Sequence, residues 1–103
     1  MDFNDKVYAV VSRIPYGKVC TYGDIAKFLG SGKSSRMVGY AMNKCHLYAL
    51  SIPAHRVVNR NGVLTGKHHF ATHTMMQELL ENEGLAISED SIINFEQHRW
   101  YPH

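Results

Sequence analysis

The stretch TYGDIAKFLGSGKSSRMVGYAMNK, residues 21–44, contains two helical patterns separated by a short turn of glycine, serine and lysine. Thr21 and Asp24 have a spacing like that of a capping box, in which two side chains accept backbone N–H groups at the start of a helix. Gly30 is typical of the position that follows a helix. Two short helices joined by a glycine-containing turn predict a helix-turn-helix.

The second helix of this pair is expected over residues 36–44, with Ser34 or Ser35 as its N-cap. Arg36 stands in the first turn, where the helix dipole disfavours a cation. This placement suggests that Arg36 contacts something outside its helix. The alternative is that Arg36 is a surface residue without a specific role. The expected buried stripe comprises Met37, Val38, Ala41 and Met42. A different face carries Arg36, Tyr40 and Asn43.

The chain before this pair predicts another helix, which should end before Pro15 because proline disfavours helix at the preceding residue. Its expected apolar face comprises Phe3, Val7, Val10, Val11 and Ile14. Beyond the pair, the Asn61-Gly62 dipeptide predicts a β-hairpin that joins residues 56–58 to residues 63–66.

A last helix is expected within residues 72–84, ending at Gly84. Its inward-facing residues should be Met75, Met76, Leu79 and Leu80. The tail is expected to fold back on the body through Ile92, Ile93, Phe95 and Trp100. The fold class is therefore mainly α with a short β-hairpin, in one domain that spans residues 1–103.

The formal net charge of +2 hides an uneven distribution. Residues 13–67 contain nine Lys or Arg and a single acid, Asp24, whereas residues 68–103 contain six acids and a single base, Arg99. A basic middle on a small domain is typical of a protein that binds a polyanion. A solvated basic face is the alternative.

The sequence also limits the compartment. No apolar stretch approaches the roughly 18 residues of a membrane span, and the acidic start is unlike a signal peptide. Cys20 and Cys45 lack the spacing of a C-x-x-C motif, so reduced thiols in a cytoplasmic protein are expected.

Five sequence motifs along most of the chain are similar to those of a known protein family. They are Ile14-Pro15-x-Gly17-x-Val19-x-Thr21-Tyr22-Gly23-x-Ile25-Ala26, Arg36-x-Val38-Gly39-x-Ala41, Ile52-Pro53-Ala54-His55-Arg56-Val57-Val58, Gly62-x-Leu64-x-Gly66 and Leu79-Leu80-x-x-Glu83-Gly84. Together they resemble the active-site domain of the O6-alkylguanine-DNA alkyltransferases, in the same order and with one extra residue between Arg36 and Pro53. The resemblance runs from about residue 3 to residue 84 and implies a winged helix-turn-helix DNA-binding domain.

One position departs from that family. Its pattern is Pro-Cys-His-Arg, in which the cysteine accepts the alkyl group, whereas this chain has Ala54. The chain thus looks like the alkyltransferase-like proteins, which lack the cysteine, often have tryptophan there, and bind alkylated DNA without repairing it. Transfer needs a thiolate activated by a base. Cys20 and Cys45 have no such partner in the sequence, so no enzyme activity is expected.

The resemblance also assigns roles to individual residues. Tyr22 matches the tyrosine that rotates the nucleotide, and Arg36 matches the arginine that fills the vacated base stack. His55 and Glu83 match the pair that activates the cysteine; here we expect a structural pair, with Arg56 tying the loop to the body. The expected base pocket comprises Tyr22, Pro53, Ala54, His55, Val57 and Lys67. The expected DNA-binding residues are Thr21, Tyr22, Arg36, Gly39, Tyr40, Ala41, Asn43 and Arg60, with further phosphate contacts from Lys18, Lys33 and Lys44.

The resemblance implies a sensor that enters the minor groove, flips O6-alkylguanine out of duplex DNA, and marks it for nucleotide excision repair. Its partners would be the damaged duplex and nucleotide excision repair proteins, with no cofactor, no metal and a monomeric state. His69 and His73 could share a metal on a helix, but no further ligand lies at a suitable spacing. Two alternatives stay open: a general winged-helix module without lesion preference, and a residual enzyme that uses another thiol or a water activated by His55.

Overall fold

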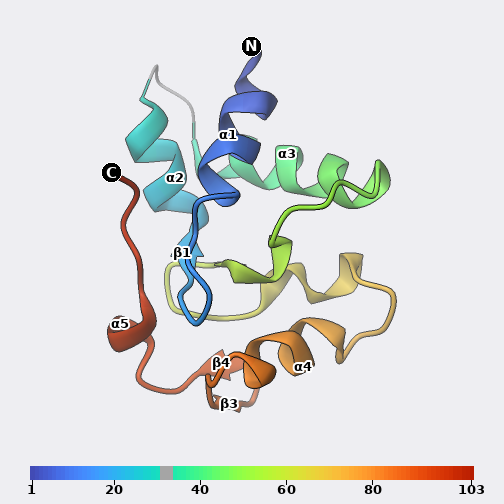
Figure 1. Ribbon diagram of the computed structural model, residues 1–103, viewed down its shortest axis with the longest axis vertical. Coiled ribbons are helices and arrows are strands. Elements are labelled where there is room, and N and C mark those ends of the chain that lie inside the picture. Colours follow the sequence, from blue (N-terminus) through green and yellow to red (C-terminus); the bar gives the residue numbers. More distant parts are fainter. Residues whose placement is uncertain (31–33) are drawn as a thin grey trace.

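The computed structural model describes residues 1–30 and 34–103. Three helices form the upper half of the molecule in Figure 1: α1 (Phe3–Val11), α2 (Tyr22–Leu29) and α3 (Ser35–Leu47). The lower half holds α4 (Met75–Asn82) and a small hairpin, and the tail then runs back up beside α2. Most of the turn expected between α2 and α3, with Lys33, lies outside the described residues.

Capping residues define the ends of these helices. Asp2 and Asp5 form a capping box at the start of α1, which ends at Val11, well before Pro15. The hydroxyl of Thr21 accepts the N–H of Asp24 at 3.0 Å, as the sequence predicts. The carboxylate of Asp24 does not complete a capping box, because it pairs with Arg99 in the tail.

The helix α3 is longer than predicted and buries a slightly different stripe. Ser34 is its N-cap, and the buried residues are Val38, Ala41, Met42 and Cys45. This set follows the spacing i, i+3, i+4, i+7 of one helix face. Met37 lies at the edge of that face and is 37% exposed, so its predicted burial is wrong. The helices α1, α2 and α3 share one hydrophobic cluster, to which Ile14, Cys20 and Val57 also belong.

Two short strands link the halves of the molecule. β1 (Cys20–Thr21) pairs in parallel with β2 (Val57–Val58). The predicted hairpin at residues 56–66 is therefore wrong, although its turn forms. The Asn59 N–H donates to the Val63 carbonyl at 3.1 Å, and Gly62 adopts a φ of 77°. The local turn signal was correct, but burial against Cys20 and Thr21 determines the strand partner.

The antiparallel hairpin lies instead in the tail, where β3 (Ile87–Ser88) pairs with β4 (Ser91–Ile92). Glu89 and Asp90 form its turn with φ values of 50° and 61°. The loop after β2 joins this hairpin, because the Leu64 N–H donates to the Asp90 carbonyl at 2.9 Å.

A second hydrophobic cluster fills the lower half. It comprises Val19, Val58, Leu64, Met76, Leu80, Leu85 and Ile92, with Phe95 packed against it. Met75 is 38% exposed, so its predicted burial is wrong; in the tail, Ile92 is buried whereas Ile93 is 46% exposed. After α5 (Phe95–His98), the Trp100 side chain packs against the first cluster, and its backbone N–H donates to the Val19 carbonyl at 2.7 Å.

Within the described residues, no helix has both the length and the apolar character that a membrane crossing requires.

Candidate functional site

The motif loop that contains Ala54 lies between α3 and α4 (Figure 1). Ala54 begins a short 3-10 helix, η1 (Ala54–Arg56), which leads directly into β2. Two backbone hydrogen bonds fix the turn: the Ala54 N–H donates to Ile52 at 2.8 Å, and the Arg56 N–H donates to Pro53 at 3.0 Å. The methyl group of Ala54 packs against the first hydrophobic cluster.

The residues that follow Ala54 converge on Glu83, at the end of α4. His55 Nε2 lies 2.6 Å from one carboxylate oxygen of Glu83. The Arg56 guanidinium donates to both oxygens at 2.9–3.1 Å and also to the Ile14 carbonyl at 2.9 Å. The Gly17 N–H adds a further bond of 2.7 Å to Glu83. The cluster therefore ties the motif loop to α4 and to the turn after α1.

This arrangement determines the ionisation of Glu83. Burial would raise the pKa of its carboxyl group, but the bonds from Arg56, Gly17 and His55 outweigh burial and lower the pKa to about 2. The carboxylate is thus ionised at any physiological pH. Its side chain is 6% exposed, so water competes little for its oxygens.

A pocket of about 340 Å³ opens beside Ala54 and His55. The other residues around it are Cys45, His46, Ala49, Leu50, Ile52, His69, Phe70, Ala71, Met75 and Leu79. Of the expected base-pocket residues, only Ala54 and His55 line this pocket. Val57 is buried in the core, and Lys67 Nζ lies 2.6 Å from the carboxylate of Asp90.

Tyr22 lines a second pocket, of about 440 Å³, with Gly23, Ser35, Asn59 and Arg60. It lies where the starts of α2 and α3 face the turn after β2. Burial raises the pKa of the Tyr22 hydroxyl, although a hydrogen bond with Thr65 opposes the shift. A Cβ atom on Gly66 would stand 3.1 Å from that hydroxyl, so glycine allows the loop to approach Tyr22 closely.

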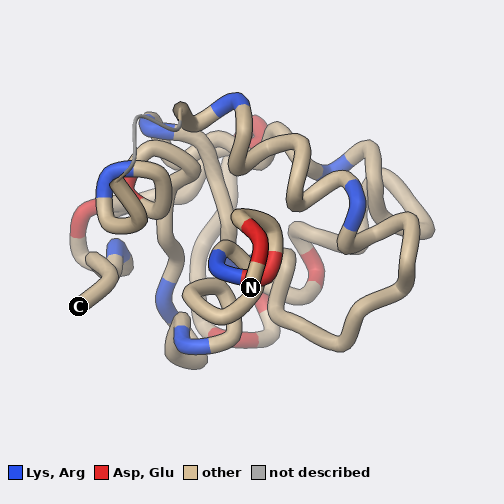
Figure 2. Tube along the Cα trace, turned by 90° about the horizontal axis from the view of Figure 1, so that it is seen from above, with Lys and Arg blue, Asp and Glu red and all other residues tan. Residues whose placement is uncertain are grey.

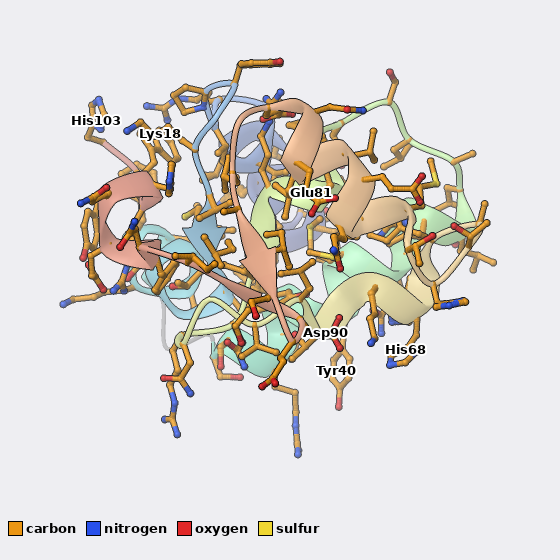
Figure 3. The ribbon with its side chains drawn as sticks, turned by 90° about the horizontal axis from the view of Figure 1, so that it is seen from below. Lys18, Tyr40, His68, Glu81, Asp90 and His103 are labelled. Atoms are coloured by element: carbon orange, nitrogen blue, oxygen red, sulfur yellow. The ribbon has the colours of Figure 1, made fainter. Side chains whose placement is uncertain are left out.

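The outer face of α3 carries several of the predicted DNA-binding residues. Arg36, Tyr40 and Asn43 are exposed, and Tyr40 projects from α3 at the edge that also carries His68 and Asp90 (Figure 3). Thr21 and Ala41 are buried instead, as the cap of α2 and as part of the first cluster.

The basic side chains do not all share this face. Figure 2 shows basic segments along α3 and at other parts of the surface, with acidic segments beside the N-terminus. Lys18 lies at the edge opposite Tyr40 in Figure 3, and its ammonium donates to the Gln97 carbonyl at 3.2 Å. A phosphate contact from Lys18 stays a prediction, and this lysine lies apart from the exposed residues of α3.

Both thiols lie in the core. Burial raises the pKa of Cys20 to about 12 and that of Cys45 to about 11. A protonated, inaccessible thiol is a poor nucleophile. Neither sulfur has the histidine partner that activation requires among the hydrogen bonds of the described residues.

Some features of the site could not be read from the sequence. Asp90, the ion-pair partner of Lys67, is 23 residues away along the chain. His69 stacks on His46, and no spacing in the sequence indicates that these two residues meet. The helix that would bring His69 and His73 together is absent, because η2 (Thr65–His69) ends before His73. The described residues contain no group of three potential metal ligands.

Comparison with known proteins defines the family. Residues 2–85 match the model of the 6-O-methylguanine DNA methyltransferase DNA-binding domain. The chain is 37% identical to alkyltransferase-like protein 1 of Schizosaccharomyces pombe, over 98% of this chain and 96% of that protein. It is 38% identical to the DNA base-flipping protein of Escherichia coli, over 95% of this chain and 74% of that protein.

The structure also resembles S. pombe Atl1 in complex with damaged DNA containing O6-carboxymethylguanine. The TM-score is 0.79 at 36% identity, covering 97% of this chain and 95% of that chain. The mainly helical fold with a helix-turn-helix, predicted from residues 21–44, is confirmed by this match. The chain belongs to the 6-O-methylguanine DNA methyltransferase family and is an alkyltransferase-like member of it.

Proposed function

We propose that the protein is a non-catalytic sensor of O6-alkylguanine in duplex DNA. One observation carries the proposal: Ala54 stands between Pro53 and His55, where the family pattern has its alkyl-accepting cysteine, while the His55–Glu83 pair behind it is intact. The likeness to Atl1 bound to damaged DNA supports the same reading.

The absence of transfer follows from the chemistry of the site. The methyl group of Ala54 cannot attack an alkyl carbon, and the raised pKa values of Cys20 and Cys45 keep both thiols protonated. With Ala54 at the acceptor position, the His55–Glu83 pair has no thiol to activate, and its hydrogen bond would fix the loop. The alkyl group therefore stays on the guanine.

A protein that enters by the minor groove reaches the O6 substituent only when the guanine leaves the duplex, because O6 lies on the major-groove edge of the base pair. Arg36 is exposed at the start of α3, and its planar guanidinium can stack in the vacated space and donate to the orphaned base. Tyr22 and Arg60 line the pocket beside α3 and would contact the rotated nucleotide and its backbone. Gly39 allows close approach of α3 to the minor groove, since no atom lies within 4 Å of where its Cβ would stand.

The flipped base would lie with its O6 substituent against Ala54. The small side chain leaves space on that side, which supports tolerance of substituents larger than methyl. Lys67 would have to leave Asp90, or share it, to contact the purine. Bound lesions would be shielded from active alkyltransferases and handed to nucleotide excision repair by this monomeric, cytoplasmic protein.

Fluorescence titration into matched duplexes with guanine or O6-methylguanine tests the proposal. We expect tighter binding to the lesion, and an Arg36→Ala variant should lose most of the difference. If the wild-type protein binds the two duplexes with equal affinity, it is a general winged-helix DNA-binding module without lesion preference. A Lys6→Ala variant, changed on α1, serves as the matched control because Lys6 lies outside the two helices of the motif.

A further inference from the structure

Three histidines line the pocket that contains Ala54: His46 from α3, His55 from η1 and His69 from η2. The rings of His46 and His69 stack with centroids 5.7 Å apart, and the edge of Phe70 meets His46 at 4.5 Å. Apart from these imidazoles and Cys45, the side chains that line the pocket are apolar, and none of the described residues around it is Asp or Glu.

The nitrogens of His46 and His69 are available to a ligand. Neither ring makes a hydrogen bond within the described part of the chain, whereas His55 is bonded to Glu83. No buried side-chain nitrogen there lacks a partner, so the unbonded nitrogens of the half-buried His46 ring are reached by water, and His69 is itself exposed. Two unpaired donors on an otherwise apolar wall fit a ligand with a short carbon chain and a polar end.

We propose that this pocket holds the O6 substituent of the flipped guanine and that His46 and His69 select substituents ending in a carboxylate. The inference rests on the proposed function, since it is the position of Ala54 that brings the substituent here. An imidazole N–H donates to a carboxylate, and an imidazolium also attracts its charge. The apolar lining residues Leu50 and Met75 would pack on the carbon chain.

The same pocket predicts a pH dependence. Burial and the neighbouring His69 lower the pKa of His46, so without ligand its ring is neutral at neutral pH. A bound carboxylate would favour the protonated ring, and binding would then take up a proton. The other titratable groups facing His46 are Cys45, His55 and His69. Glu83 lies behind His55 and is held by Arg56. Affinity for the carboxylate should therefore fall as the pH rises.

The test compares duplexes with O6-carboxymethylguanine and with its uncharged amide counterpart, O6-carbamoylmethylguanine, beside O6-methylguanine and guanine. At a pH of about 6, near the pKa of free histidine, we expect the acid to bind about tenfold more tightly than the amide. This acid-to-amide affinity ratio should shrink at a pH of about 8, where the His46 ring is neutral. A His46→Phe, His69→Phe double variant keeps the aromatic wall and should bring the ratio close to one.

His73→Phe is the matched control, because His73 is exposed and lies outside the pocket wall. Melting temperatures show whether each variant folds. The inference is overturned if the wild-type protein binds the acid and the amide with nearly equal affinity at both pH values. It is also overturned if the folded double variant keeps the wild-type preference for the acid. If the methylated duplex is still preferred over guanine, the proposed function stands while this inference fails. Equal binding of every modified duplex and guanine contradicts the proposed function itself.

Discussion

Replacing Glu83 with Gln should destabilise the protein strongly, because the carboxylate joins the motif loop to α4 and to the turn at Gly17. The side chains of Glu83, His55 and Arg56 are 6%, 13% and 16% exposed. In the Glu83→Gln variant the largely buried Arg56 guanidinium loses the negative charge that it pairs with. Breaking one partner of a buried pair costs about 3–5 kcal/mol.

The pKa of Glu83 gives an independent estimate. Bonding lowers it from 4.5 to about 2, and at about 1.4 kcal/mol per pKa unit the ionised form contributes roughly 3 kcal/mol at neutral pH. Because the folded-state pKa lies below the unfolded value, this stability is complete above about 4.5 and is lost as the pH falls toward 2. A loss of this size lowers the melting temperature by roughly 12 °C or more in a domain of this length.

Thermal unfolding followed by circular dichroism measures the effect. Glu81→Gln is the matched control, since Glu81 is exposed on α4 and, among residues 1–30 and 34–103, its carboxylate accepts only from Gln77, at 3.2 Å. The difference between wild type and Glu83→Gln should narrow in acid, below a pH of about 4.5. A Glu83→Gln variant that melts within a few degrees of Glu81→Gln at neutral pH would refute the reasoning.

Three further predictions concern binding and reactivity. Arg36→Ala should weaken lesion binding by about ten- to a hundredfold, the cost of an unfilled gap in the base stack, without shifting the melting temperature; equal affinities of variant and wild type would contradict this role. Arg60→Ala should weaken binding to damaged and undamaged duplexes alike, and titration in increasing NaCl should show that the slope of log binding constant against log salt falls in magnitude by about one. A selective loss of lesion binding would instead place Arg60 at the base. Cys20 and Cys45 should react only slowly with a thiol reagent in the folded protein at neutral pH, because burial raises their pKa values to about 12 and 11, and they should react fully in denaturant. Rapid labelling of the native protein would contradict this by showing that one thiol is accessible.

The parts of the fold encoded by local signals could be predicted. The caps at Thr21 and Ser34 and the end of α2 at Gly30 require only neighbouring residues. The turn at Gly62 is equally local, but the partner of the strand before it is not. Val57 and Val58 pair with Cys20 and Thr21, more than thirty positions earlier, because both segments are buried at the junction of the two halves.

The same distinction applies to the site. The motif order places His55, Arg56 and Glu83 in one family pattern, and the structure brings the three side chains together. Periodicity could not reveal that Asp90 holds Lys67 or that His69 meets His46, since each contact joins loops whose relative position depends on the whole chain. Periodicity alone does not separate Met37 and Met75 from the core, because each lies at the edge of a buried helix face.

Native mass spectrometry of the protein with an equal mixture of guanine and O6-methylguanine duplexes tests the central claim most directly. The duplexes differ by one methylene in mass, so the bound partner is read at once, and denaturing the same sample locates the alkyl group. The account predicts a complex enriched in the methylated duplex, with an unmodified protein mass and the methyl group still on the DNA. Equal capture of the two duplexes, or a methyl group on the protein, would contradict it.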